Sequence, residues 1–153
     1  MTNNDILRRL RYAFNYNDEK MAGIFAHAKY RVSKPMIISW LNKDSDDDFK
    51  ELADVELANF LNGFITEKRG KKDGPLPQPE TRLSNNLILK KLKIALNFQS
   101  TDMMEVFGLM DVKMSEHELS AFLRNPKQSQ YRQLNDQYLR NFLYGLQKKF
   151  RPS

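Results

Sequence analysis

The chain has 153 residues, of which 41% are hydrophobic and 29% charged, proportions typical of a globular protein and not of a disordered one. Cysteine is absent, which excludes disulfides and thiolate metal sites. The 25 Lys and Arg residues against 19 Asp and Glu residues give a formal net charge of +6, which permits binding to a polyanion. The first residues lack a signal-peptide pattern, and no run of about 18 apolar residues occurs. We therefore expect a cytoplasmic protein with no membrane span.

The sequence contains an internal duplication. Residues 3–71 recur without a gap 82 positions later, as residues 85–153. The segment Asn-Asn-Asp-Ile-Leu at 3–7 returns as Asn-Asn-Leu-Ile-Leu at 85–89. A repeat of this kind predicts two copies of one structural unit. We divide the chain into a first helical repeat at 1–70, a Pro-rich linker at 71–83 and a second helical repeat at 84–153.

Apolar residues at helical spacing predict the first two helices of each copy. The first helix runs over about 4–14, with Asn3 or Asn4 expected to cap its free amides. The second runs over about 18–28 and buries a narrow apolar stripe. The stripes and their counterparts in the second copy are Ile6, Leu7, Leu10, Phe14, Met21, Ile24, Phe25 and Ala28, matched by Ile88, Leu89, Leu92, Leu96, Met103, Val106, Phe107 and Met110.

The third and fourth helices complete each copy. Ser33 is predicted to cap the third helix, with Pro35 tolerated in the first turn, and Ser115 with Glu118 has the spacing of a capping box in the second copy. The fourth helix carries a continuous apolar stripe from Leu57 to Ile65. No strand-like alternation occurs. The fold class predicted is all-α, a tandem duplication of a four-helix unit.

The linker and the small size of each copy predict how the copies pack. Pro75, Pro77 and Pro79 favour an extended connector. A unit of about 70 residues has a marginal core of its own. We expect the two copies to pack on one another about a pseudo-two-fold axis. Gly63 and Gly145, each within a fourth helix, are expected to permit close helix contact between the copies.

Three segments resemble the YehS-like bacterial family, a domain of unknown function. They are Asn-Asp-Ile-Leu-Arg-Arg-Leu-Arg at 4–11, Phe-Leu-Asn-Gly-Phe-Ile-Thr-Glu-Lys-Arg-Gly-Lys at 60–71, and Asn-Asn-Leu-Ile-Leu-Lys-Lys-Leu-Lys at 85–93. The resemblance covers essentially the whole chain. It implies a duplicated helical fold in a bacterial cytoplasmic protein, and it supplies no activity and no functional residue.

Nucleic acid is the most concrete partner that the residues suggest. Basic clusters recur on the first helix of each copy, opposite the apolar stripe, and predict a solvated basic face suited to phosphates. They are Arg8, Arg9 and Arg11, matched by Lys90, Lys91 and Lys93. A solvated helix surface without a ligand is the alternative interpretation.

The third helices carry half of a helix-turn-helix pattern. The segment Val-Ser-Lys-Pro-Met-Ile-Ile-Ser-Trp-Leu at 32–41 ends as such motifs do. The preceding connection is too long for the standard turn, and Arg31 stands where glycine is usual. The polar contacts expected from this element are Lys34, Ser39, Asn42 and Arg124. The alternative is that the helix has only a packing role.

Other features argue against a calcium site and against catalysis. Asp44 to Asp48 lacks the glycine and glutamate of an EF-hand loop, and His27 and His117 are not equivalent positions and accompany no triad or phosphate loop. We therefore expect a non-enzymatic binding module with no catalytic residue, metal or cofactor, binding DNA or RNA. The alternative is an adaptor that binds another protein in the groove between the copies, rimmed by Lys68, Arg69, Lys148 and Lys149.

Overall fold

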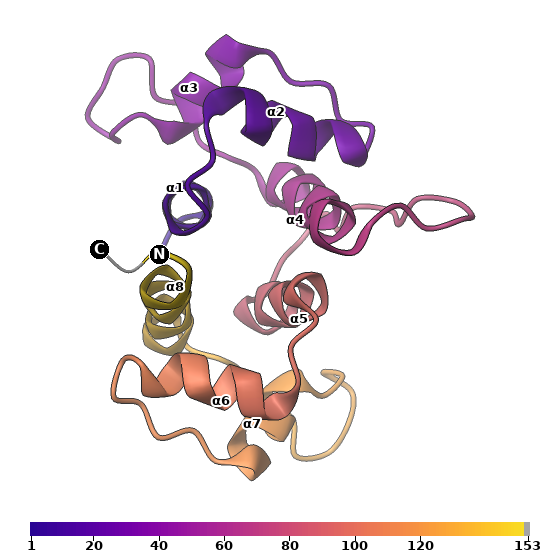
Figure 1. Cartoon of the computed structure of the whole chain (residues 1–153), viewed down its shortest axis with the longest axis vertical. Coiled ribbons are helices and arrows are strands. Elements are labelled where there is room, and N and C mark those ends of the chain that lie inside the picture. Colours follow the sequence, from indigo (N-terminus) through magenta and orange to yellow (C-terminus); the bar gives the residue numbers. More distant parts are fainter. Residues whose placement is uncertain (152–153) are drawn as a thin grey trace.

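The computed structural model describes residues 1–151, and this part of the chain forms eight α-helices and no strand. The first repeat comprises α1 to α4 and the second α5 to α8 (Figure 1). Their bounds are α1 Asn3–Ala13, α2 Asp18–His27, α3 Lys34–Leu41, α4 Asp54–Arg69, α5 Asn85–Leu96, α6 Ser100–Gly108, α7 Glu116–Leu123 and α8 Asp136–Phe150. The predicted all-α tandem duplication is confirmed.

Equivalent residues of the two repeats adopt the same unusual backbone conformation. Asn15 and Asn97, which follow the first helix of each repeat, have φ of 56° and 54°. Lys29 and Asp111, which follow the second helix, have φ of 56° and 59°. Few residues other than glycine take positive φ. The chain therefore turns in the same way at both places in both repeats.

Within each repeat the first and fourth helices run parallel. At their starts, the Asn3 amide donates to Asp54 Oδ1 over 2.7 Å, and at their ends the Phe14 and Phe64 rings lie 5.1 Å apart. The second repeat reproduces the contact at the starts, where Asn85 donates to Asp136 over 2.7 Å. The segment that links the end of the first helix to the start of the fourth must therefore run back along both helices. In the first repeat this segment contains α2 and α3, and in the second repeat it contains α6 and α7.

The two repeats meet through α1 against α8 and α4 against α5, the same pairing made twice. Arg151, just beyond α8, donates to the Tyr12 carbonyl near the end of α1 over 3.1 Å. Arg69, at the equivalent place on α4, donates to the Ile94 carbonyl near the end of α5 over 2.9 Å. These contacts exchange under a two-fold rotation, which the arrangement in Figure 1 also displays.

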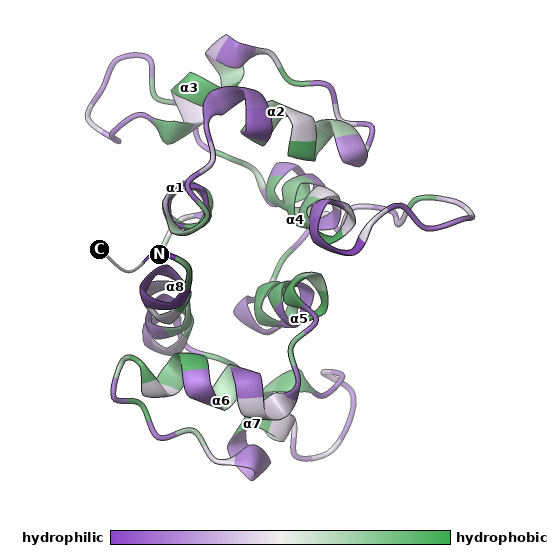
Figure 2. Cartoon of the chain, in the orientation of Figure 1, coloured by the Kyte–Doolittle hydropathy of each residue, from purple (hydrophilic) through white to green (hydrophobic). Residues whose placement is uncertain are grey.

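The molecule thus has a central layer of four parallel helices, α1, α4, α5 and α8. The pairs α2/α3 and α6/α7 cover it at opposite ends of the long axis (Figure 1). Apolar faces turn inward toward the contacts between these layers (Figure 2), and the buried side chains form one continuous core through both repeats. No helix among residues 1–151 has the length and apolar character needed to cross a membrane.

Glycine sets the distance between the central and outer layers. A Cβ on Gly63 of α4 would lie 1.9 Å from the Ile24 carbonyl oxygen of α2, and a Cβ on Gly145 of α8 would lie 2.3 Å from the Val106 oxygen of α6. Close helix contact at both glycines was predicted. The expectation that it joins the two copies is wrong, because each glycine meets a helix of its own repeat.

The tandem asparagines are structural. Asn4 is 2% exposed; its amide donates to the carbonyls of Trp40 and Lys50 over 2.9 and 2.8 Å, and its oxygen accepts from the Leu52 amide over 3.0 Å. Asn86 makes the three equivalent bonds. The predicted capping role of Asn3 or Asn4 is wrong, since Thr2 caps α1 in a capping box with Asp5.

Candidate nucleic-acid interface

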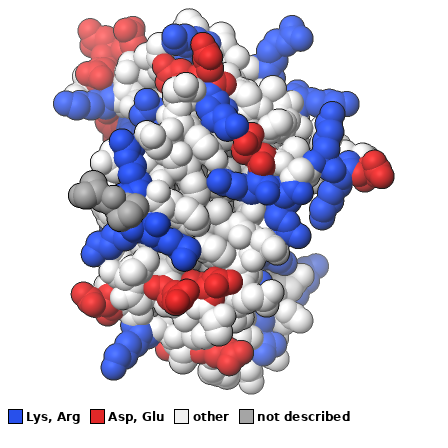
Figure 3. Space-filling view, in the orientation of Figure 1, with Lys and Arg blue, Asp and Glu red and all other residues white. Residues whose placement is uncertain are grey.

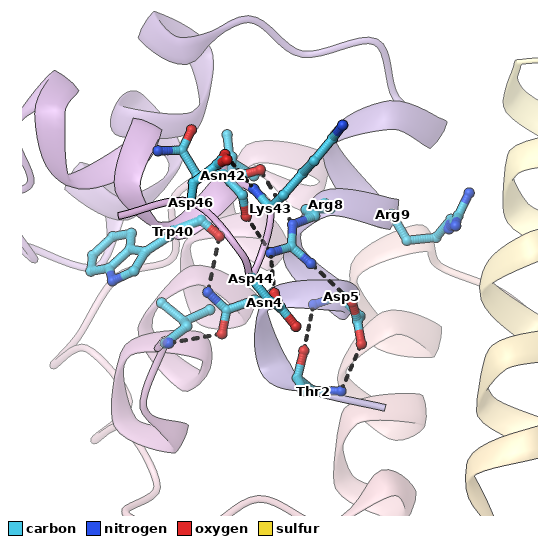
Figure 4. A network of polar contacts seen from close by, with 12 residues as sticks. Thr2, Asn4, Asp5, Arg8, Arg9, Trp40, Asn42, Lys43, Asp44 and Asp46 are labelled. Carbon is cyan, nitrogen blue, oxygen red and sulfur yellow. Dashed lines mark hydrogen bonds and ion pairs between the residues drawn. The ribbon is translucent and has the colours of Figure 1, made fainter. Parts of the chain in front are cut away.

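Arg8 is committed to contacts inside the first repeat (Figure 4). Its guanidinium forms ion pairs of 2.9 Å with both Asp5 and Asp44. It also donates to the carbonyls of Leu41 and Asn42. These bonds fix the loop that follows α3 to α1. Arg8 therefore lacks the unpaired charge that a phosphate contact requires.

Arg9 turns away from this network toward α8 (Figure 4) and belongs to the contact between the repeats. It donates to Gln147 over 2.8 Å and to the Tyr144 hydroxyl over 3.1 Å, with its guanidinium carbon 4.2 Å from the Tyr144 ring centre. Its counterpart Lys91 is only 8% exposed. The Lys91 ammonium bonds to Asn62 over 2.6 Å and pairs with the linker residue Glu80 over 3.1 Å.

The predicted solvated face along both first helices is therefore wrong. The other repeat covers the side of α1 and α5 that carries Arg9 and Lys91. Of the six basic residues, only Lys90 is exposed; Arg11 and Lys93 are half-buried in the last turns of α1 and α5. These three residues stay candidates for contact with an anion.

The third helices lie far from one another, α3 with one outer layer and α7 with the other (Figure 1). Lys34 is exposed at the start of α3, while Ser39, Asn42 and Arg124 are half-buried. Residues 28–33 separate α2 from α3, longer than the usual turn of three or four residues in a helix-turn-helix. The structure brings Asn42 to Arg8 and places Arg124 beside Lys90 in one pocket. It does not gather the ten predicted residues on a single surface.

A different basic cluster forms where the central helices end. Because α1, α4, α5 and α8 are parallel, their C-terminal turns meet at one end of the layer, which faces the viewer in Figure 3 with Lys and Arg on both sides of an uncharged centre. The basic residues of these turns, with Arg151 just beyond α8, are Arg11, Lys68, Arg69, Lys93, Lys148, Lys149 and Arg151.

Aromatic and aliphatic side chains occupy the space between these cations. The Phe150 ring lies 4.9 Å from Phe14 and 6.4 Å from Phe98, joining the ends of α1, α5 and α8. Three large apolar side chains here remain open to solvent, with Tyr12 42%, Ile94 39% and Phe150 40% exposed. We call the seven basic residues together with Tyr12, Phe14, Ile94, Phe98 and Phe150 the basic-aromatic face.

Cations on this face lie directly over rings. The Lys68 ammonium is 4.7 Å from the Phe14 ring centre, and the Arg151 guanidinium carbon is 4.0 Å from that of Tyr12. Desolvation against the rings lowers the pKa of Lys68 from its ordinary value. Burial, together with the nearby Glu67 carboxylate, raises the pKa of Tyr16 at the edge of this cluster to about 12.

The helix ends give this cluster a structural reason as well. Each helix places a partial negative charge at its C-terminus, and four parallel helices place four at one end of the layer. Lys and Arg in the last turns offset that charge. The cations therefore stabilise the parallel arrangement whether or not a ligand binds, and only the exposed rings between them require a further explanation.

Two comparisons with known proteins identify the family. The model described as "Protein of unknown function (DUF1456)" matches residues 3–70 and again residues 85–151. This chain belongs to the DUF1456 family. It is also 37% identical over 147 residues to "Uncharacterized protein YehS" of Escherichia coli (strain K12), covering 95% of this chain and 94% of that protein. No solved structure matches significantly.

The two DUF1456 copies coincide with the two four-helix repeats of the structure. The sequence predicts that Lys68, Arg69, Lys148 and Lys149 rim a groove between the copies, and it does not join them to Arg11 and Lys93. In the structure all six residues lie in the last turn of a helix, which the sequence predicted for Arg11 and Lys93. What was missing was the parallel direction of the four helices.

Proposed function

We propose that this protein binds single-stranded nucleic acid on the basic-aromatic face. The observation that carries the proposal is the exposure of Tyr12 and Phe150 between cations contributed by all four central helices. Proteins that hold single strands combine a basic surface for the phosphates with aromatic rings on which bases stack. Both parts are present on one end of the molecule.

The arrangement favours a single strand over a duplex. A duplex buries its bases and presents grooves that a helix or strand enters, and neither α3 nor α7 lies on the basic-aromatic face. Exposed bases can instead stack on Tyr12 and Phe150, while Lys149 and Arg69, both exposed, contact the flanking phosphates. The pseudo-two-fold arrangement supplies cations on either side of the rings.

Fluorescence anisotropy with labelled homopolymeric DNA and RNA strands tests the proposal at low and moderate salt. We expect affinity for single strands that exceeds affinity for a duplex of the same length and weakens as salt rises. Tyr12→Ala should weaken binding about tenfold or more through lost stacking. Lys149→Ala should reduce the salt dependence. Lys50→Ala removes an exposed lysine beside the start of α1, away from this face, and serves as the matched control.

Absence of single-strand binding by micromolar protein at low salt would refute the proposal. So would equal losses for Lys149→Ala and Lys50→Ala, since binding would then follow net charge alone.

A protein-interaction adaptor is the second candidate. The exposed Ile94 favours this candidate, because an aliphatic side chain stacks on a base less well than an aromatic ring does. Under this reading, Ile94→Ala should reduce co-purification of a partner that survives nuclease treatment, and Tyr12→Ala should leave nucleic-acid binding unaltered. These outcomes separate the two functions.

A further inference from the structure

The second repeat contains a pocket that the basic-aromatic face does not include. It has a volume of about 240 Å³ and lies between the start of α5 and the end of α7 with its following loop. Lys90 and Arg124 supply its two charged side chains, and no acidic residue lines it. Tyr131 supplies an aromatic side chain to its lining, whereas the Phe122 side chain is only 1% exposed. We call this cavity the second-repeat pocket.

The first repeat shows what an anion does at the equivalent position. Arg8, the counterpart of Lys90, holds the carboxylates of Asp5 and Asp44 at 2.9 Å each. In the second repeat Leu87 stands in place of Asp5, and Pro126 in place of Asp44. Both internal carboxylates are therefore lost while the cation is kept.

Neither cation of the second-repeat pocket has an acidic partner in the described part of the chain. Among residues 1–151, no carboxylate lies within ion-pair distance of Lys90 or of Arg124. An arginine and a lysine that share a cavity repel each other, and an anion between them would remove that repulsion.

The corresponding cavity of the first repeat has the opposite charge. It measures about 390 Å³ and is built from equivalent positions: Thr2 for Ser84, Asn4 for Asn86, Asp44 for Pro126 and Phe49 for Tyr131. Its charged lining consists of Asp44 and Glu51. The duplication therefore produced two related cavities, one acidic and one basic.

The second-repeat pocket is held in shape before any ligand arrives. Asn86 fixes its floor by bonding to the Phe122 and Arg132 carbonyls over 2.9 and 2.7 Å and to the Leu134 amide over 2.9 Å. Ser84 caps α5 by accepting from the Leu87 amide over 3.1 Å. A preformed site loses less conformational freedom on binding.

We propose that the second-repeat pocket binds a small organic anion through its carboxylate or phosphate group. Lys90 and Arg124 hold the anionic group where the first repeat places the Asp44 carboxylate, and Leu87 and Tyr131, both half-buried, contact an apolar or planar remainder. The site is independent of the proposed nucleic-acid function, since its lining residues on α5 lie in the first half of that helix and those of the basic-aromatic face lie in its last turn.

NMR titration of the ¹⁵N-labelled full chain tests the site with three probes: benzoate, phenyl phosphate, and sodium chloride at matched ionic strength. Benzoate and phenyl phosphate share a planar remainder and differ in the anionic group. We expect saturable shifts of the amides at 84–90 and 122–126 with at least one organic anion, at concentrations on the order of 1 mM, and small shifts at 2–8. The stronger ligand identifies the preferred anionic group.

Two variants and one control place the effect on the named residues. Lys90→Ala combined with Arg124→Ala should weaken binding at least tenfold, whereas Lys149→Ala, a charge removed from the basic-aromatic face, should leave it unchanged. Leu87→Asp restores the first-repeat carboxylate beside Lys90 and should weaken binding by internal competition in a folded protein. Amide dispersion confirms the fold of each variant.

Shifts that chloride reproduces at the same ionic strength would overturn the proposal, as would shifts that persist in the Lys90 and Arg124 double variant. Loss of single-strand binding in Tyr12→Ala with anion binding intact would show that the two sites are separate.

Discussion

The two repeats share their buried polar bonds and differ in their surface ion pairs. The buried residues Asn4 and Asn86 make the same three bonds, and equivalent bonds agree within 0.1 Å in length. Arg8, in contrast, has two carboxylate partners, and its counterpart Lys90 has none among the described residues. A buried polar group that loses its partner costs more than an exposed ion pair contributes. Duplication has therefore left the interior alike and allowed the surface to diverge.

The contacts between the repeats follow the same division. The helix pairing and the arginine-to-carbonyl bonds at the helix ends occur twice, but Arg9 faces Tyr144 while Lys91 faces Asn62 and the linker residue Glu80. We call the α1/α8 and α4/α5 contacts the two seams. The linker residue Glu80 lies at the α4/α5 seam, and among residues 1–151 no linker covers the α1/α8 seam. Four sets of substitutions measure how far the equivalence of the repeats extends.

The largest effect is expected at the interlayer glycines. Gly63→Ala should lower the free energy of unfolding by about 3 kcal/mol or more, because the added methyl group meets backbone that cannot yield without moving α2. Gly145→Ala should cost less, since its contact distance is longer. Gly23→Ala, with nothing within 4 Å of the added Cβ, should be neutral or stabilising by up to about 1 kcal/mol. Urea denaturation measures all three; equal costs at Gly63 and Gly23 would contradict the close packing.

The buried asparagines come next. Asn4→Ala and Asn86→Ala should each cost about 2 to 3 kcal/mol, because two carbonyls and one amide lose their partner inside the protein. Similar values for the two variants would confirm that the repeats are equivalent in energy as well as geometry. Asn3→Ala, at a half-buried position with two bonds, should cost less. Thermal and chemical unfolding provide the measurement. A much smaller loss of unfolding free energy for Asn86→Ala than for Asn4→Ala would show that the two repeats are not equivalent.

The linker contact should contribute a smaller amount. A double-mutant cycle of Lys91→Ala and Glu80→Ala should give a coupling free energy of about 1 kcal/mol, since the ammonium is buried and the carboxylate half-buried. The cycle of Arg9→Ala with Glu80→Ala is the control and should give no coupling, because Glu80 lies across the other seam. Equal coupling in both cycles would show that the linker does not distinguish the seams.

The smallest effect concerns Asp136, which joins the start of α8 to the chain terminus of the first repeat. Its bonds from Asn85 and from the Met1 ammonium lower its pKa below the ordinary value of 3.8. Its contribution to stability is therefore present above that value and is lost as the pH falls through the lower, folded-state pKa. Asp136→Asn should be slightly less stable than the parent at pH 7, and the gap should close in acid. A gap that is constant from neutral pH to pH 2 would exclude the ionic contribution.

The candidate sites show how far sequence patterns reached. Apolar spacing located the helices because it depends on neighbours one turn apart, and the caps at Ser33 and Ser115 are as predicted. The buried role of Asn4 was missed although it lies three residues before Leu7, on the same side of α1. The prediction of a solvated basic face is wrong at Arg9 and Lys91, because the residues that cover them, Tyr144 and Asn62, come from the other repeat.

The sequence by itself determined the duplication, the helical class and the order of the helices, since these follow from periodicity and from local capping chemistry. Only the tertiary structure decided that four helices run parallel, that their ends gather cations around exposed rings, and that one of two equivalent cavities has lost its internal carboxylates. Those properties depend on contacts between residues far apart in the chain, and helical spacing says nothing about which distant surface will cover a given side chain.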